Sequence, residues 1–260
     1  MQRYFINRID EIIVFNKLEK EELKQIVDIM IRETLERLEK KNIVMKVNDK
    51  VFLSTNNNDS YIGVISNITN DSIEITVCEI LENKTELNSF VVIAQGLVRR
   101  EKTEEVLRRI TELGASGYIQ VEMDRSVVKV KDYSKNDKLD RMNKIVKEAS
   151  EQSHRNKIPV VYPLVNIKNF IEQFKDYDVK IFAYEESGRS NDKSLKSLIK
   201  LGQNKKMVVL VGPEGGFSEK EVKLLINSGF NSVGLGPRIL RTETAPLYIM
   251  SAISYELELN

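Results

Sequence analysis

The 260-residue chain has a single cysteine, Cys78, and a single histidine, His154. One cysteine excludes an internal disulfide bond and fits a reducing compartment. No apolar run reaches the roughly 18 residues that a membrane-spanning helix needs, and the first residues, MQRYFINRID, lack the apolar core of a signal peptide. The chain also lacks an excess of either charge, because it contains 40 basic and 39 acidic residues. We therefore expect a soluble cytoplasmic protein, and its net charge decides nothing about a polyanionic partner.

The residues that are present divide the chain into two parts. Residues 18–41 repeat apolar side chains at three- and four-residue steps, which predicts an amphipathic helix. Residues 43–95 read as short strands separated by turn signals. We expect residues 1–98 to form a β-rich domain in which this helix is an insertion, and residues 99–260 to form an α/β domain.

In the second part, helical and strand patterns alternate, which predicts a mostly parallel sheet with helices on its faces. Gly114 follows the first of these helices as a natural cap, and Pro159 begins a connection. Helices are expected at 102–113, 138–153, 167–175, 194–201, 219–227 and 244–258, and strands at 118–123, 179–185, 207–211 and 232–236.

The segment MVVLVGPEGGFSEKEV holds the sharpest local pattern. Its apolar strand meets a glycine turn at 212–216, and Ser218 with Glu221 predicts a capping box that starts a helix. A second apolar strand, SVGLG, also ends in glycine and leads to a helix with Pro246 in its first turn. Ligands bind at the carboxyl ends of strands in open α/β sheets, so the two strand ends indicate one cleft. A tight turn without a ligand is the alternative for GPEGG, which matches no nucleotide fingerprint.

GPEGGFSEKEV and LGPRILRTETA together resemble the signature of the RsmE-type methyltransferases of the SPOUT class. TELGASGYIQVEMDRSVV, EASEQSHRNKIPVV and MQRYFI resemble three further blocks of that family. The resemblance implies a trefoil-knotted α/β domain with a mostly parallel sheet, behind a small PUA-like RNA-binding domain. It also implies a homodimer that uses S-adenosylmethionine, without a metal, to methylate N3 of one uridine in 16S ribosomal RNA, conventionally position 1498.

The amino-terminal part departs from the family pattern. NIVMKVNDKV stands where the family carries an H…VLR-x-K-x-GD segment, so Val44 replaces the usual arginine and Asn48 the usual glycine. Arg109 stands where lysine is usual before ELG. The cofactor half keeps its motifs while the RNA-docking half is altered, which leaves the exact target open.

By the resemblance, three loops form the cofactor pocket. Backbone groups would bind the adenine, and Ile239 and Leu240 would pack against it; ordinary core packing is the alternative for these two side chains. The expected cofactor-binding residues are Tyr184, Glu185, Gly212, Pro213, Glu214, Gly215, Gly216, Leu235, Gly236, Ile239, Leu240, Thr244 and Ala245.

The charged residues of RILRTETAP have a use in this chemistry. Uracil N3 must lose its proton before it attacks, and the developing negative charge spreads onto O2 and O4. We expect Arg241 to stabilise that charge, with Glu243 orienting Arg241 or contacting the cofactor. A structural Arg241–Glu243 pair that braces the loop is the alternative. Methylation at pyrimidine C5 usually needs a cysteine adduct, and Cys78 lies outside the catalytic half.

Candidate RNA contacts are less specific. Glu148, Gln152 and Arg155 are spaced to share one helix face on the RNA side of the cleft, whereas His154 fits a surface role. Residues 125–147 hold eight Lys or Arg against three Asp, a net of +5 (8 − 3). Phosphate contact and a solvated basic face both fit this stretch. The expected RNA-binding residues are Arg3, Arg109, Arg125, Glu148, Gln152 and Arg155.

Two other functions stay open. A SPOUT methyltransferase could act on a different RNA or on ribose 2′-O, which nucleoside analysis of the product distinguishes. A non-catalytic RNA-binding relative is the other possibility, which a cofactor-binding measurement distinguishes.

Overall fold

The computed structural model of the protein describes residues 45–54, 59–69, 72–81, 85–128, 137–184 and 195–259. The chain divides into two compact units. Of the described residues, 45–53 and 61–81 belong to the first unit, and 54, 59–60 and 85–259 belong to the second. The predicted helix 18–41, together with Arg3, Val44 and Glu185, lies outside the described residues.

A three-stranded sheet forms the first unit. Its strands are β1 (Lys50–Ser54), β2 (Ser60–Ile68) and β3 (Ile73–Leu81), in the order β1-β2-β3. The strand expected to start at residue 43 is not formed over 45–47, because a turn there leads into β1. Asn48 in this turn has φ 76°, a left-handed conformation that asparagine tolerates better than most side chains. Asparagine at this position therefore preserves a backbone geometry that suits glycine.

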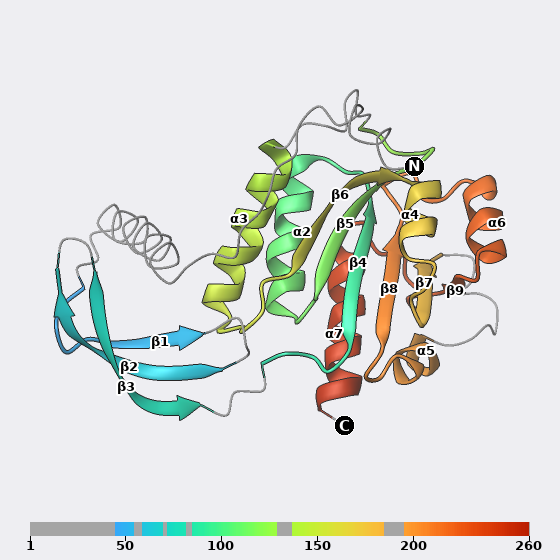
Figure 1. The fold of residues 1–260 in the computed structure, drawn as a ribbon. Helices are drawn as coiled ribbons and strands as arrows, with labels where there is room; N and C mark the ends of the chain where they lie inside the picture. Colours follow the sequence, from blue (N-terminus) through green and yellow to red (C-terminus); the bar gives the residue numbers. More distant parts are fainter. Residues whose placement is uncertain are drawn as a thin grey trace, which may run out of the picture. The chain divides into compact units, whose positions relative to one another are not determined.

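The second unit is built on a six-stranded sheet in which every neighbouring pair is parallel (Figure 1). The strand order is β6-β5-β4-β8-β7-β9. The prediction of an α/β fold with a mostly parallel sheet is confirmed. The strands are β4 (Phe90–Gly96), β5 (Gly117–Glu122), β6 (Val160–Asn166), β7 (Val179–Ala183), β8 (Lys206–Val211) and β9 (Asn231–Val233).

The strand β4 does not belong to the β-rich unit, contrary to the domain boundary expected at residue 98. It lies between β5 and β8 at the centre of the parallel sheet, with Val92 opposite both Gly117 and Val208. Its apolar run VVIA is typical of a strand that is buried on both faces. The second unit begins before β4, because the described residues from 85 onward belong to it.

Helices cover both faces of this sheet (Figure 1). Val91 and Ile93 of β4 belong to the core on one face, while Val92 and Ala94 belong to the core on the other, as the alternation of a strand requires. The first face is covered by α2 (Arg100–Glu112), α3 (Asp137–Gln152), α5 (Leu195–Leu201) and α7 (Thr244–Glu258), and the second by α4 (Ile167–Gln173) and α6 (Glu219–Asn227).

The strand β6 was not predicted, because Pro163 interrupts its pattern. It is an edge strand, and its pairing with β5 shifts between Ile119 opposite Tyr162 and Val121 opposite Val165. β6 thus carries one more residue than β5 over this interval, which is a β-bulge. Proline is tolerated at sheet edges and at bulges, so Pro163 is compatible with β6 although it hides the strand pattern in the sequence.

The chain leaves the neighbouring strands β4 and β8 in opposite directions. From β4 it continues through α2 to β5, and from β8 it continues through α6 to β9, which lies beyond β7. A reversal of this kind opens a crevice at the carboxyl ends of the strands. None of the helices in the described part of the chain is both long and apolar enough to cross a membrane.

Candidate active site

A cavity of about 760 Å³ opens at these carboxyl ends, within the range of small-molecule sites. Three segments form its walls: the loop 212–217 after β8, residues 183–184 at the end of β7, and the loop 235–243 after β9. Lys102 of α2 and Arg125 of the loop after β5 complete the lining. Segments that are far apart in the sequence therefore meet where the fold predicts a ligand site.

The glycine turn packs so closely on its neighbours that side chains would not fit. A Cβ atom on Gly96, at the end of β4, would lie 2.4 Å from the backbone nitrogen of Pro213. A Cβ atom on Gly215 would lie 2.8 Å from the carbonyl oxygen of Arg125, whose Nη1 donates a 3.3 Å hydrogen bond to Gly215 O. Glycine at both positions lets the turn lie directly against β4 and the loop after β5.

Two other glycines leave the backbone bare at the cavity. Gly216 has φ 67° and Gly236 has φ 99°, a region that side chains rarely adopt. Open space stands where a Cβ atom on either residue would be, and both residues line the cavity. A ligand can therefore approach the main chain at these two points.

The predicted capping box at the start of α6 is confirmed, and its two side chains also bond to Asp124 in the loop after β5. Ser218 Oγ accepts from the N–H of Glu221, and Glu221 Oε2 accepts from the N–H of Ser218 at 2.8 Å. Glu221 Oε1 also accepts from the N–H of Asp124 at 2.8 Å, and Ser218 Oγ donates to Asp124 Oδ2 at 2.7 Å. One buried carboxylate thus joins the loop after β5 to the helix that follows the glycine turn.

A buried chain of hydrogen bonds fixes the loop 235–243 to the centre of the sheet. Tyr118 Oη donates to Gln95 Oε1, Gln95 Nε2 donates to Thr242 O, and Thr242 Oγ1 donates to Gly212 O, each at 2.8 Å. Burial raises the pKa of Tyr118, which keeps its hydroxyl a donor. Neither Gln95 nor Thr242 was expected at this site, although a glutamine within the apolar run FVVIAQG indicates a buried polar contact.

Lys102 lies between two carboxylates of the cavity wall. Its Nζ is 3.1 Å from Glu243 Oε2 and 3.2 Å from Glu214 Oε1. Hydrogen bonding to Glu243 and then to Glu214 raises the pKa of Lys102 above its ordinary value. Burial acts to raise the pKa of Glu243, but the backbone N–H of Glu243 and the ammonium of Lys102 outweigh it and lower that pKa. Lys102 and Glu243 are therefore both charged at neutral pH.

Arg241 is exposed and lines the same cavity. The expected alternative of a structural Arg241–Glu243 ion pair is wrong, because the ion-pair partner of Glu243 is Lys102. Among the described residues no carboxylate forms an ion pair with Arg241. Within this part of the chain, the charge of Arg241 at the cavity is therefore not neutralised by direct contact.

The structure brings most of the expected cofactor residues together. Ile239 is 75% exposed, so it is not a core residue, whereas Leu240 is half-buried and packs on the core. Thr244 begins α7 and does not line the cavity. The expected residues that do line it are Tyr184, Gly212, Pro213, Glu214, Gly215, Gly216, Leu235, Gly236, Ile239, Leu240, Arg241, Glu243 and Ala245, and Arg238 of the expected loop 235–240 lines it too. The lining residues that were not expected are Lys102, Ala183, Val211, Phe217, Glu219 and Thr242.

The expected RNA contacts do not converge. Arg125 lines the cavity, whereas Arg109 is exposed in the last turn of α2, where it pairs with Glu112 at 3.1 Å. Glu148 and Gln152 are exposed on α3 and lie outside the cavity. Because α3 runs from the carboxyl end of β5 to the amino end of β6, its last turn lies at the opposite end of the sheet.

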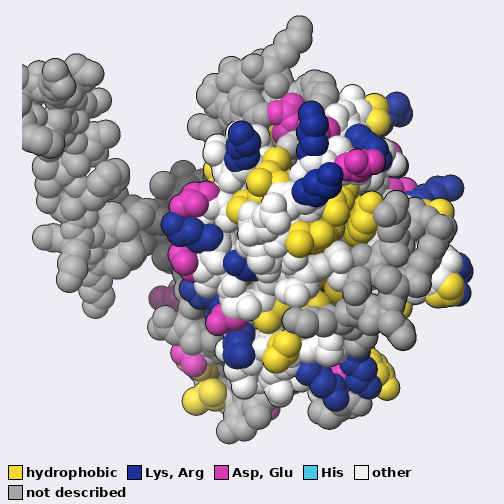
Figure 2. All heavy atoms as spheres, turned by 90° about the vertical axis from the view of Figure 1, so that its right-hand side faces the viewer, with side chains coloured by type: hydrophobic (Ala, Val, Ile, Leu, Met, Phe, Trp, Pro, Cys, Tyr) yellow, Lys and Arg dark blue, Asp and Glu magenta, His cyan; other side chains and the backbone are white. Residues whose placement is uncertain are grey.

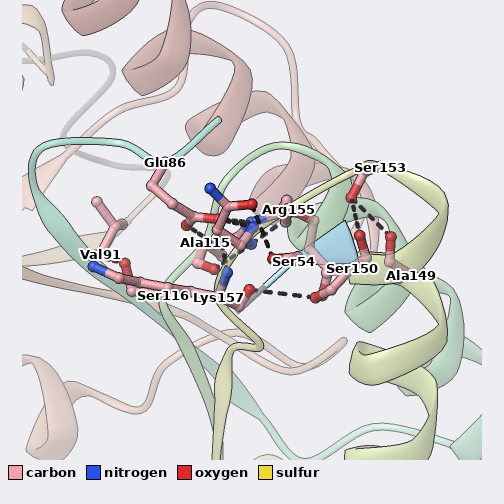
Figure 3. Close-up of polar contacts among 12 residues, drawn as sticks. Ser54, Glu86, Val91, Ala115, Ser116, Ala149, Ser150, Ser153, Arg155 and Lys157 are labelled. Atoms are coloured by element: carbon pink, nitrogen blue, oxygen red, sulfur yellow. Dashed lines mark hydrogen bonds and ion pairs between the residues drawn. The ribbon is translucent and has the colours of Figure 1, made fainter. Parts of the chain in front are cut away.

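Arg155 needs a correction, since it does not share a helix face with Glu148 and Gln152. The helix ends at Gln152, and the Arg155 side chain is 3% exposed (Figure 3). Its Nη1 donates to the carbonyl oxygens of Thr111 and Ala115, at 2.9 and 2.7 Å, and its Nη2 lies 2.6 Å from Glu86 Oε2. In this structure Arg155 closes the carboxyl end of α2 and presents no surface to RNA.

Three comparisons place the chain among known proteins. A family model described as an RNA methyltransferase domain matches residues 85–254, which contain the parallel sheet and the cavity. The chain is 36% identical over 265 aligned positions to ribosomal RNA small subunit methyltransferase E of Bacillus subtilis, with all of this chain and 98% of that protein covered. The residues that build the site therefore form an RNA methyltransferase domain.

Solved structures agree with this class. The S-adenosyl methionine-bound ribosomal RNA small subunit methyltransferase E of Neisseria gonorrhoeae superposes with a TM-score of 0.72 at 25% identity, covering 87% of this chain and 89% of that one. A Legionella pneumophila protein solved with its bound cofactor SAM gives 0.69 at 25% identity, covering 91% and 90%. The chain belongs to the ribosomal RNA small subunit methyltransferase E family.

Proposed function

We propose that the protein transfers the methyl group of S-adenosylmethionine to N3 of one uridine in 16S ribosomal RNA, the uridine of the family's reaction. One observation carries the proposal: Arg241 enters the cavity between the glycine turn and the loop 235–243 without a carboxylate partner among the described residues. Membership in a family of small-subunit ribosomal RNA methyltransferases supplies the substrate class.

The cavity fits the cofactor. Its volume suits a ligand of this size, its lining is half apolar, and Gly216 and Gly236 offer bare backbone. Ile239, which is largely exposed, offers an apolar surface for an adenine ring. Bound there, S-adenosylmethionine supplies an electrophilic methyl group on a positively charged sulfur. Within the described residues no cluster of three or more metal-ligating side chains occurs, and the reaction needs no metal.

Arg241 supplies the charge stabilisation that the nucleophile needs. Uracil N3 attacks only after it loses its proton, and the resulting negative charge spreads over O2, N3 and O4. A fixed guanidinium beside one of these oxygens stabilises the anion more than the neutral base, which is how preorganised donors accelerate reactions. Glu243 then contributes a negative charge to the site and does not orient Arg241, because its carboxylate pairs with Lys102.

Local clusters of cations support contact with RNA. Arg100, Arg108 and Arg141 surround one carboxylate, Glu104, with N–O distances of 2.7, 4.0 and 2.5 Å. Three guanidinium groups around one carboxylate give this cluster of four side chains a net +2 (3 − 1), which suits phosphate groups. On the face shown in Figure 2, Lys and Arg side chains are interspersed with Asp and Glu, so this face carries no patch of a single sign.

The finer architecture is part of the same proposal. After the edge strand β9 the chain returns to the sheet centre, where Thr242 bonds to Gln95 of β4 and to Gly212, and this return path supports a trefoil knot. The three-stranded sheet of the first unit supports a PUA-like RNA-binding domain. Tyr248 and Tyr255 on α7 and Leu259 directly after it are exposed apolar residues, with exposed fractions of 46%, 62% and 74%, which supports a homodimer. Action on ribosomal RNA, as in the family, supports a cytoplasmic location.

The test is a methyl-transfer assay with labelled S-adenosylmethionine on small ribosomal subunits that lack the modification, followed by nucleoside mass spectrometry. Label in 3-methyluridine supports the proposal. Label in a 2′-O-methylated nucleoside, or no label from an enzyme that binds the cofactor, supports the alternative of another reaction or another RNA. No cofactor binding in calorimetry supports a non-catalytic RNA-binding relative.

A further inference from the structure

We propose that Lys102 is a positioning residue of this site, which keeps the Glu243 carboxylate away from Arg241. The inference rests on the proposed function and concerns a residue outside the sequence motifs of the cavity. The ammonium of Lys102 lies 3.1 Å from Glu243 Oε2 and 3.2 Å from Glu214 Oε1. These two carboxylates belong to different loops, so one side chain of α2 holds both walls of the cavity.

Glu243 has a second cation within reach. Arg241 precedes it by two residues in a turn that the N–H of Thr244 closes on Arg241 O at 2.9 Å. The positive charge of Arg241 also acts to lower the pKa of Glu243, after the larger effects of the backbone N–H and Lys102. A carboxylate released from Lys102 would therefore find the guanidinium as its nearest alternative partner.

The position of Lys102 favours a durable contact. Its side chain is 33% exposed and that of Glu243 is 19% exposed, so water screens this pair less than a pair on the open surface. The helix α2 fixes the Lys102 backbone, and Glu214 provides a second anchor for the ammonium. Glu243 Oε2 is buried without a hydrogen-bond partner among the described residues, and the ammonium of Lys102, at 3.1 Å, is the cation that forms an ion pair with it.

The charges around the cavity show what Lys102 contributes. Among the described residues, the charged groups that line it besides Arg241 are Lys102, Arg125, Arg238, Glu214, Glu219 and Glu243, so three cations balance three carboxylates in this set. The charge of Arg241 is the surplus of the set, +1 by 4 − 3. Removal of the Lys102 ammonium would bring the sum to zero and would free the carboxylate that lies nearest in sequence to Arg241.

A free Glu243 would weaken the reaction through Arg241. A guanidinium paired with a carboxylate stabilises the uracil anion less, and an opposite charge within 4–6 Å typically shifts a pKa by about one to three units. The apparent pKa of the N3–H group of bound uridine would then rise toward its value in water. Lys102 thus acts on the reaction by controlling the partner of Arg241, without contact with the reacting atoms.

The first test observes Glu243 directly and does not need turnover. The pKa of its carboxyl group is measured by ¹³C NMR on protein labelled at glutamate, with the signal assigned through Glu243→Gln. In Lys102→Met we expect this pKa to stay below the ordinary value because Arg241 replaces the ammonium, and to rise when Arg241→Met is added. A rise in Lys102→Met alone would overturn the inference, whatever the RNA substrate proves to be.

The second test measures the single-turnover methyl-transfer rate against pH, with RNA and cofactor saturating. Lys102→Met should shift the midpoint of the profile upward by about one unit, Lys102→Arg should not, and Lys102→Met/Glu243→Gln should return it toward the wild-type position even where the rate stays low. Lys196→Met, which removes an exposed lysine paired with Glu256 on α7, is the control for loss of one charge. A slower Lys102→Met enzyme with an unmoved midpoint would mean a structural role only.

Discussion

The hydroxyl group of Thr242 donates a 2.8 Å hydrogen bond to the carbonyl oxygen of Gly212, which joins the two loops that carry the sequence signatures of this family. The same Thr242 accepts a hydrogen bond from Gln95 of β4 through its own carbonyl oxygen. The glycine turn and the arginine loop therefore form one unit that is held from the centre of the sheet. Disturbing either loop should disturb both walls of the cavity.

Substitution of Gln95 and Thr242 tests this coupling. Thr242→Val and Gln95→Met each leave a buried polar group without its partner, which costs about 1–3 kcal/mol of unfolding free energy. Because the two side chains act in one network, we expect the double variant to lose less than the sum, with an interaction of about 0.5–3 kcal/mol. Urea unfolding and calorimetry with S-adenosylmethionine measure both effects. Strict additivity, with unchanged cofactor affinity, would show that the two loops are independent.

Arg241→Met should abolish most of the catalytic activity while the cofactor still binds. Loss of one donor that stabilises a developing anion typically lowers kcat by about 10²–10³-fold. The dissociation constant for S-adenosylmethionine should stay within about tenfold of wild type, because the backbone of the glycine turn remains. Rapid-quench methyl transfer and calorimetry give the two numbers, with Lys196→Met as the control. A fully active Arg241→Met enzyme would remove this residue from the mechanism.

Arg155→Met should destabilise the fold and not the RNA complex. Removing one partner of a buried ion pair costs about 3–5 kcal/mol, and here it also frees the carbonyl oxygens of Thr111 and Ala115. Arg109→Met is the matched control, since its exposed pair with Glu112 should contribute about 0–1 kcal/mol. Denaturant unfolding compares the two variants. Equal stabilities, or a selective loss of RNA affinity in Arg155→Met, would restore the original expectation for Arg155.

The Glu104 cluster predicts a defined loss of stability in acid. Hydrogen bonds from Arg141 and then Arg100 lower the pKa of Glu104 from its ordinary 4.5 to about 2. A carboxyl group with a depressed folded-state pKa stabilises the fold fully above its unfolded-state value, and the contribution disappears as the pH falls from about 4.5 to about 2. Glu104→Gln should therefore be less stable at neutral pH and should lose less stability over that acid interval. Parallel pH profiles for the two proteins would contradict the assignment.

Much of the fold is predictable from local patterns. The apolar strands and amphipathic helices expected within residues 99–260, and the Ser218–Glu221 capping box, depend on residues close in sequence, and each of these is found. The meeting of the loops after β8 and β9 was also predictable, because parallel strands place their carboxyl ends at one edge of a sheet. The strand β6 was not, since Pro163 is acceptable only at an edge with a bulge, and no local pattern reveals which strand is an edge.

The errors in the site have a common physical cause. Helical spacing predicts which side chains share a face only while the helix lasts, and α3 ends before Arg155. The ion-pair partner of Arg155 is Glu86, which is 69 positions away in the sequence. The partner of Glu243 is Lys102, which is 141 positions away. Arg241 and Glu243 are close in sequence and so suggest an ion pair, but in this fold Lys102 of α2 lies closer to Glu243 and is its partner.

The path of the chain around the cavity has a consequence for synthesis. Its walls draw on residues from Lys102 to Ala245, and the hydrogen bond that joins two of them involves Thr242, which comes 140 residues after Lys102 (242 − 102). Domains fold as the ribosome releases them, and contacts distant in sequence form late. A nascent chain that stops before Thr242 has therefore not joined the walls of the cavity, and the site can hold the cofactor only after the ribosome has released this residue.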